Sequence, residues 1–268
     1  MNELNSVNFK VYQLMKTLLV SIMLIILSMG LKGQTMTIQL KNGKKIDYPI
    51  NEIEFITYSG GNTNKTDQSV FTDPRDGETY KTVQIGNQVW MAENLKATKF
   101  NDGEAIPHGT TKLYWSTSSN SAYCWYNNDE STYKSTYGAL YNWYTVNSGK
   151  LCPAGWHVPS LNEWNALGTL LGGNQIAGGK LKESGYSHWA SPNQKASNGS
   201  KFTALPGSSR DYSGQWGGTI GTRGLWWSST TIDATHAYNL YLSNDSEAFR
   251  KQVDQVAGGH ACIPDGDC

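Results

Sequence analysis

One segment near the middle of the chain, residues 152–164, constrains the fold more than any other. It reads CPAGWHVPSLNEW, in which a short apolar stretch leads directly into a helix start. Ser160 and Glu163 have the spacing of a capping box. Apolar residues then recur at helical spacing until Gly172 and Gly173 end the run. The segment therefore predicts a short buried strand followed by a helix over about 160–171, and it carries no obvious chemistry.

Turn signals divide the rest of the chain into short elements. Apolar and polar side chains alternate in residues 37–40 and 46–48, on either side of a Lys-Asn-Gly turn. The same pattern occurs in residues 79–85 and 88–92, on either side of Gly86-Asn87. Each pair of segments therefore predicts a β-hairpin. A second helix is expected over 137–146, while 94–120 and 173–199 are expected to be loops. Further short strands are expected at residues 202–206, 225–229, 237–242, 247–252 and 256–263. This order predicts an α+β fold with antiparallel sheets.

The N-terminal region has the pattern of an export signal. Lys10 and Lys16 precede an apolar run at residues 18–31, and cleavage is expected between about residues 30 and 34. Translation starts at Met1 or at Met15, and the alternative to a cleaved signal is a retained membrane anchor. Gln34 stands where a lipoprotein would need Cys, so we expect a secreted or cell-surface protein that is not a lipoprotein.

These patterns define the expected organisation of the chain. Residues 1–33 are the signal peptide, 34–58 a short β-hairpin segment, 59–68 a polar linker and 69–268 the main domain. The membrane is involved only through the cleaved signal peptide. Export places the four cysteines in an oxidising compartment, where they can form disulfides.

The net charge and the aromatic content of the chain indicate which classes of ligand it could bind. The formal net charge is zero and no basic stripe is present, which gives no support to nucleic-acid binding. The chain contains 10 Trp and 15 Tyr, which suit either an aromatic core or a surface that binds sugar or protein. Trp226 and Trp227 are adjacent, so in a strand one is expected inside and the other at the surface. The expected stacking platform for sugar rings consists of Trp189, Tyr212, Trp216, Trp226 and Trp227.

Other chemistries find weaker support in the sequence. Asn127 and Asp129, and Asn244 and Asp245, bring oxygen atoms together as a calcium site would, but turn formation explains them better. We therefore expect no cofactor, with calcium as the alternative. The carboxylates are scattered, Glu163 is explained by the helix cap, and nothing marks a reactive thiolate, so no catalytic residue is expected.

From residue 71 onward the chain contains a series of specific motifs. They are DGETYKTV at 76–83, GNQVWMAENL at 86–95, YCWYNND at 123–129, YGALYNW at 137–143, the 152–164 segment, AGGKLK at 177–182, FTALPG at 202–207 and WWSST at 226–230. Over these roughly 200 residues the chain resembles the Fibrobacter succinogenes major paralogous domain family. The hairpin segment is similar to a short N-terminal segment of secreted Bacteroidota proteins.

This resemblance implies a C-type-lectin-like domain with two helices and small antiparallel sheets, in exported or surface proteins whose biochemical role is largely uncharacterised. Four cysteines allow three pairings, of which we expect Cys152 with Cys262, a bridge from the buried strand to the final strand, while Cys124 and Cys268 pair or stay free. The final stretch, residues 258–263, departs from the family pattern, and relatives often have a second Cys near position 135, where this chain has Ser135. The leading expectation is a non-catalytic binding module for glycan or protein. The alternatives are a structural or adhesive scaffold and, with less support, an enzyme.

Overall fold

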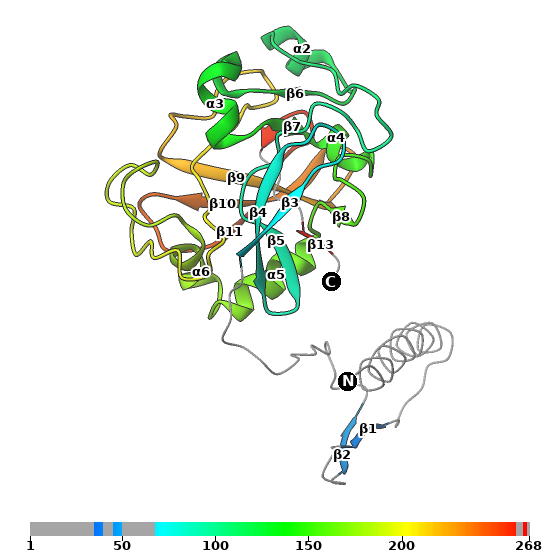
Figure 1. Cartoon of the computed structure of the whole chain (residues 1–268), viewed down its shortest axis with the longest axis vertical. Coiled ribbons are helices and arrows are strands. Elements are labelled where there is room, and N and C mark those ends of the chain that lie inside the picture. Colours follow the sequence, from blue (N-terminus) through cyan, green and yellow to red (C-terminus); the bar gives the residue numbers. More distant parts are fainter. Residues whose placement is uncertain (1–34, 40–44, 50–67, 261–264, 267–268) are drawn as a thin grey trace. The chain divides into compact units, whose positions relative to one another are not determined.

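The computed structural model describes residues 35–39, 45–49, 68–260 and 265–266 (Figure 1). The chain divides into two compact units, Met1–Tyr58 and Ser59–Cys268. In the first unit, β1 (Thr35–Gln39) pairs antiparallel with β2 (Lys45–Pro49), with Thr37 opposite Asp47. The hairpin that the alternating pattern predicts is therefore present.

A five-stranded antiparallel sheet organises the second unit. Its order is β3 (Gln68–Thr72), β4 (Thr79–Ile85), β5 (Gln88–Met91), β13 (Asp265–Gly266) and β8 (Trp156–His157). The β4–β5 hairpin forms where Gly86-Asn87 predicts it, with Gly86 at φ 65°. Strand β13, from the end of the chain, inserts between β5 and β8. The sheet therefore joins segments that are far apart in the sequence.

Two three-stranded antiparallel sheets complete the β structure. One contains β9 (Arg223–Thr231), β10 (His236–Ser243) and β11 (Arg250–Gln255), with β10 in the centre. The other contains β6 (Tyr123–Cys124), β7 (Leu140–Asn142) and β12 (Gly259–His260), with β7 in the centre. The predicted strand at 202–206 does not form, because Thr203 has a positive φ of 58° and only an isolated bridge joins Ala204 to Lys182.

The described part of the second unit has five α-helices, where the sequence predicted two. They are α2 (Lys112–Thr117), α3 (Glu130–Tyr137), α4 (Trp143–Asn147), α5 (Leu161–Leu170) and α6 (Asn174–Leu181). Helix α5 begins with the predicted capping box of Ser160 and Glu163. None of the helices among the described residues is long and apolar enough to cross a membrane.

The remaining differences have local explanations. The predicted helix at 137–146 is wrong in its first half, where residues 140–142 form the central strand β7. Helix α6 lies in a stretch expected to be a loop because its Gly178-Gly179 pair suggests a turn. A Cβ on Gly178 would lie 2.6 Å from the carbonyl oxygen of Ala248, and one on Gly179 would lie 2.6 Å from that of Lys195. The two glycines therefore permit the helix to pack closely on its neighbours.

Tryptophan dominates the core between these sheets and helices. Trp164 of α5 packs on Trp90 of β5 with 4.9 Å between ring centroids, and both rings contact Phe202. The fully buried tryptophans are Trp90, Trp115, Trp125, Trp164, Trp189, Trp226 and Trp227. Most of the tryptophan side chains therefore lie in the core.

Candidate functional site

Three members of the expected stacking platform are core residues. Trp189, Trp226 and Trp227 are each at most 1 % exposed. Their indole N–H groups donate to the Ala204 carbonyl at 2.9 Å, to Asn94 Oδ1 at 2.8 Å and to the Tyr141 carbonyl at 2.7 Å, respectively. The prediction that these residues reach a ligand is wrong, because β9 is covered on both faces and neither Trp226 nor Trp227 points to solvent.

The other two members lie at the surface. Tyr212 is 50 % exposed and Trp216 is half-buried. The Trp216 ring lies 5.1 Å from that of Tyr126, which begins a larger aromatic surface. Trp216 is therefore the predicted ligand residue that the structure connects to other half-exposed rings.

Five half-buried rings follow one another across this surface, and we call them the aromatic row: Trp216, Tyr126, Tyr133, Tyr137 and His188. Successive centroids are separated by 5.1, 5.1, 6.1 and 5.9 Å. The angles between successive rings range from 47° to 87°, so tilted and edge-to-face contacts alternate along the row. Edge-to-face and tilted contacts of this kind are favourable, and they hold the rings in a defined order.

Four chain segments build the aromatic row. Tyr126 lies in a short 3-10 turn at residues 126–128, and Tyr133 and Tyr137 lie four residues apart on α3. Asp129 caps α3 by accepting a hydrogen bond from the backbone N–H of Thr132 at 3.1 Å. Trp216 and His188 come from two later loops. The four-residue spacing of the two tyrosines would place them on one face of a helix, but α3 was not predicted from the sequence.

Arg210 supports one end of the row from inside the protein. It is 2 % exposed, and its guanidinium carbon lies 4.6 Å from the Trp216 ring and 5.1 Å from the Trp115 ring. The guanidinium donates to the carbonyl oxygens of Gly109, Thr110 and Gly214 and to Asn128 Oδ1, at 3.0 to 3.2 Å. Trp216 therefore rests on a fixed cation, which favours a fixed indole orientation.

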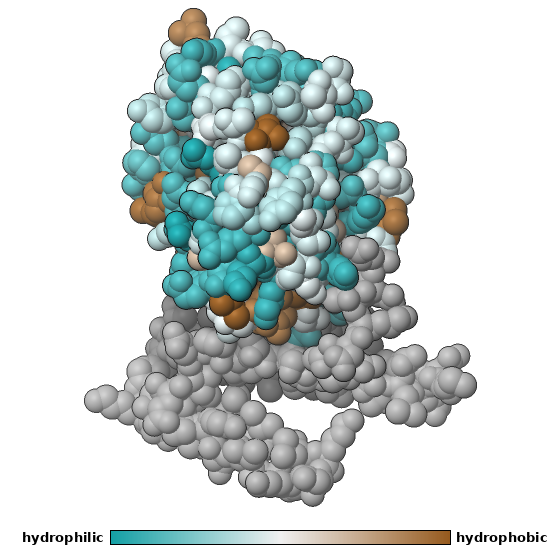
Figure 2. All heavy atoms as spheres, turned by 90° about the vertical axis from the view of Figure 1, so that its left-hand side faces the viewer, coloured by the Kyte–Doolittle hydropathy of each residue, from teal (hydrophilic) through white to brown (hydrophobic). Residues whose placement is uncertain are grey.

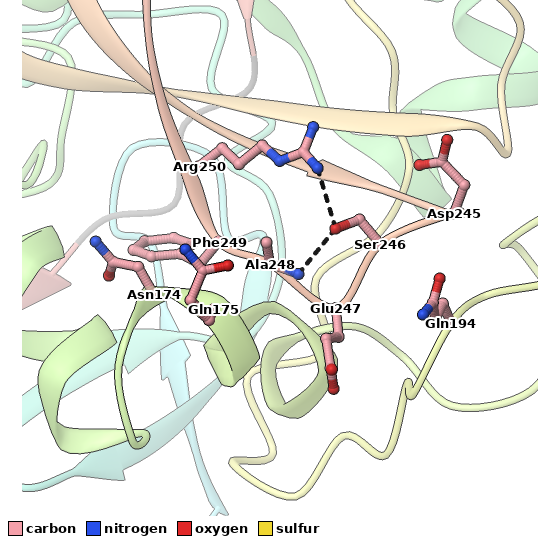
Figure 3. Close-up of a pocket in the computed structure, with 9 residues that line it drawn as sticks. All are labelled: Asn174, Gln175, Gln194, Asp245, Ser246, Glu247, Ala248, Phe249 and Arg250. Atoms are coloured by element: carbon pink, nitrogen blue, oxygen red, sulfur yellow. Dashed lines mark hydrogen bonds between the residues drawn. The ribbon is translucent and has the colours of Figure 1, made fainter.

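A second feature is a polar pocket of about 390 Å³ at the start of α6 (Figure 3). Asn174 and Gln175 lie on one side, Gln194 lies on the other, and residues 245–250 run between them. Its lining combines carboxamides with the carboxylates of Asp245 and Glu247 and the guanidinium of Arg250. The lining residues are Asn174, Gln175, Gln194, Asp245, Ser246, Glu247, Ala248, Phe249 and Arg250.

A buried cation holds the walls of this pocket together. Lys182 is 0 % exposed, and its ammonium donates to the carbonyl oxygens of Gln194, Ser243 and Ser246 at 3.1, 2.9 and 2.8 Å. Burial lowers the pKa of Lys182 to about 8, although Asp245 and Glu247 act in the opposite direction. The pocket therefore has a fixed positive charge behind it at neutral pH.

The residues considered for calcium serve mostly as turn and cap groups. Asn127 adopts a positive φ of 52°, and Asn244 donates its side-chain N–H to the Ser191 carbonyl. Asp129 caps α3, and Asp245 accepts from the Ser243 hydroxyl, which holds the pKa of Asp245 below its usual value. Within the part of the chain that the structure describes, no group of three or more His, Cys, Asp or Glu side chains is placed to hold a metal.

The described cysteines are buried thiols. Cys124 and Cys152 are both free, and burial raises the pKa of each to about 12. The expected Cys152–Cys262 disulfide is therefore not formed in this structure, and Cys262 and Cys268 lie outside the described residues. A buried thiol of such high pKa is a poor nucleophile at neutral pH.

His157 and Asp211 have structural roles. His157 Nε2 lies 3.0 Å from Glu163 Oε1, so the histidine is bound to the capping glutamate of α5. Asp211 accepts hydrogen bonds from the backbone N–H groups of Ser213 and Gln215, both at 2.9 Å. His157 and Glu163 thus hold the start of α5, and Asp211 holds the turn that follows it.

The side of the unit that carries α3 and α6 in Figure 1 faces the viewer in Figure 2. Strongly hydrophobic residues form only small, separate groups on this face, among hydrophilic and intermediate ones. Where described residues are visible on this face, they form no large contiguous apolar patch of the kind that is typical of protein interfaces.

Comparison with known proteins identifies one family. Searches among curated proteins and among solved structures found no match. The sequence does match the family described as the Fibrobacter succinogenes major domain, over residues 83–260, about two thirds of the 268-residue chain. This range contains both the aromatic row and the polar pocket. The chain belongs to the Fibrobacter succinogenes major domain family.

Proposed function

We propose that this protein is an exported, non-catalytic module, secreted or held at the cell surface, that binds extracellular glycan through the aromatic row. The export pattern at residues 10–33 supports the location. The mixed fold with small antiparallel sheets is compatible with the C-type-lectin-like architecture that the family resemblance implies. A fold alone does not fix function, so the proposal depends on the site.

The aromatic row is the observation that carries the proposal. Half-exposed Tyr and Trp rings offer apolar faces for the C–H surfaces of sugar rings and hydroxyl or indole groups for their polar edges. Successive ring centroids lie 5.1 to 6.1 Å apart, so a sugar chain that lies along the row can contact more than one ring.

The two cysteines that the structure describes support a non-catalytic role. A thiol enzyme needs an accessible thiolate, whereas the pKa values of Cys124 and Cys152 are raised to about 12 by burial. His157 and Glu163 are already bound to each other at the start of α5.

A glycan-array screen of the purified protein, run with calcium and again with a chelator, tests the proposal. We expect saturable binding to oligosaccharides in both conditions. Binding that is lost with the chelator would instead establish a calcium-dependent lectin. Absence of glycan binding in both conditions would contradict the proposal and favour a protein ligand or a structural scaffold.

A matched pair of variants assigns the binding to the row. Tyr133→Ala removes a central ring and should weaken binding about tenfold, the effect of losing roughly 1.4 kcal/mol of contact energy. Tyr186→Ala removes a tyrosine that is 66 % exposed and outside the row, and it should leave the affinity unchanged. Equal effects of the two substitutions would show that binding takes place elsewhere.

A further inference from the structure

The polar pocket at α6 differs in chemistry from the aromatic row. Its only aromatic lining residue, Phe249, is 3 % exposed, so no ring face is open to a ligand. The rest of its side-chain lining consists of carboxamides, carboxylates, one guanidinium, the Ser246 hydroxyl and the methyl group of Ala248. Recognition in this pocket must therefore depend on hydrogen bonds, and a volume of about 390 Å³ is near the lower end for small-molecule sites.

Backbone hydrogen bonds fix the three segments that form the pocket. Phe249 N–H donates to the Asn174 carbonyl at 2.7 Å, and Gly179 N–H donates to the Glu247 carbonyl at 3.0 Å. Gln194 N–H donates to the Asn244 carbonyl at 2.7 Å. Lys182 adds three bonds from behind. The walls are thus held in place before any ligand arrives, which reduces the entropy lost on binding.

The charges around the pocket are balanced. Asp245 and Glu247 supply two carboxylates, and Arg250 in the wall and Lys182 behind it supply two cations. Arg250 is directed to Ser246, whose hydroxyl lies 3.3 Å from Nη2, as Figure 3 shows. A charged ligand would disturb this balance, whereas a neutral ligand with several hydroxyl groups would find both donors and acceptors.

We propose that the polar pocket binds one neutral sugar residue, with its hydroxyl groups bonded to the carboxylates of Asp245 and Glu247 and to the carboxamides of Asn174, Gln175 and Gln194. This inference deepens the proposed glycan-binding function and rests on it, but it uses none of the residues of the aromatic row. The row contacts a sugar chain, and the pocket selects the identity of a single unit.

Titration of the purified protein with methyl glycosides of neutral hexoses, followed by saturation-transfer NMR and calorimetry, tests this inference. We expect saturable binding of at least one neutral hexoside. The corresponding uronate and amino sugar should bind at least several-fold more weakly, because each adds a charge to a balanced site. Binding of the charged sugars alone, or of none of the monosaccharides, would overturn the proposal.

Substitutions locate the bound sugar. Glu247→Gln keeps the shape and removes the charge, and Gln175→Ala truncates an exposed carboxamide at the start of α6. Each should weaken hexoside binding at least fivefold, while the thermal midpoint stays within about 2 °C of the unmodified protein because both side chains reach solvent. Gln84→Ala, which truncates an exposed glutamine on β4, is the matched control and should have no effect. Equal affinities for all three variants would also overturn the proposal.

Tyr133→Ala separates the two proposals. It should weaken oligosaccharide binding without changing hexoside binding. If oligosaccharides bind through Tyr133 but no hexoside binds, the pocket inference fails and the proposed function stands. If neither ligand binds, both fail.

Discussion

Burial of Lys182 makes the free energy of unfolding depend on pH. It is 0 % exposed, and burial lowers its pKa to about 8 from the ordinary value of 10.5. Below pH 8 both the folded and the unfolded chain hold the proton, and the folded state bears the full desolvation penalty. Between about pH 8 and 10.5 the folded chain loses its proton first, so the unfolded chain binds more protons and this residue's contribution to the free energy of unfolding rises with pH.

The comparison with Lys182→Met isolates this effect. Raising the pH from 7 to 9.5 should shift the difference in unfolding free energy in favour of the unmodified protein by on the order of 1 kcal/mol, measured by urea unfolding of both proteins. The other titratable groups are the same in Lys182→Met and in the unmodified protein, so their contributions to the pH dependence cancel in the difference. A constant difference would mean that Lys182 keeps an ordinary pKa.

Cys124 and Cys152 lead to a second prediction at the residue scale. Because burial raises the pKa of both thiols to about 12, neither should react with iodoacetamide at pH 7.5 within an hour in the native protein. Both should react fully in urea without a reductant, as peptide mass spectrometry would show. Alkylation of Cys152 that requires a reductant would instead reveal a disulfide and restore the pairing expected from the sequence.

At the scale of elements, the sequence predicts a helix or a hairpin correctly where the segment itself contains the residues that begin or end that element. The capping box predicted α5, and Gly86-Asn87 predicted the β4–β5 hairpin. Helix α6 was missed because its glycines serve a contact with Ala248 and Lys195, which are distant in sequence. The burial of Trp226 and Trp227 on both faces of β9 likewise depends on what covers the sheet. The pocket has no local signal, because residues 174–175, 194 and 245–250 meet only in the folded chain.

The capping box of α5 allows a direct test at this scale. Ser160 Oγ accepts from the Glu163 N–H at 3.3 Å, and Glu163 Oε2 accepts from the Ser160 N–H at 2.6 Å. Ser160→Ala removes the first bond and should lower the free energy of unfolding by about 1 kcal/mol in urea denaturation. Ser187→Ala, at an exposed loop position, is the control and should change it by less than about 0.5 kcal/mol. A loss no larger than that of the control would show that Glu163 and His157 hold the helix start without the serine.

At the scale of the whole molecule, the fold of the second unit depends on its last described strand. β13 pairs with β5 through Asp265 and Trp90, and with β8 through Asp265 and His157. In the described part of the chain β13 is the sole strand partner of β8, and β8 leads directly into α5, whose Trp164 packs on Trp90. The end of the chain therefore connects the five-stranded sheet to the tryptophan core.

Removal of residues 261–268 should separate β8 from β5 and loosen the attachment of α5. With backbone hydrogen bonds contributing about 1 kcal/mol each, we expect a loss of roughly 3 kcal/mol and a fall in the thermal midpoint of about 6–12 °C, measured by calorimetry. Removal of residues 1–58, which form the separate first unit, is the control and should move the main transition by no more than about 1 °C. If the two truncations have equal effects, the insertion of β13 does not hold the sheet together, and the second unit must derive its stability from the other two sheets and the tryptophan core.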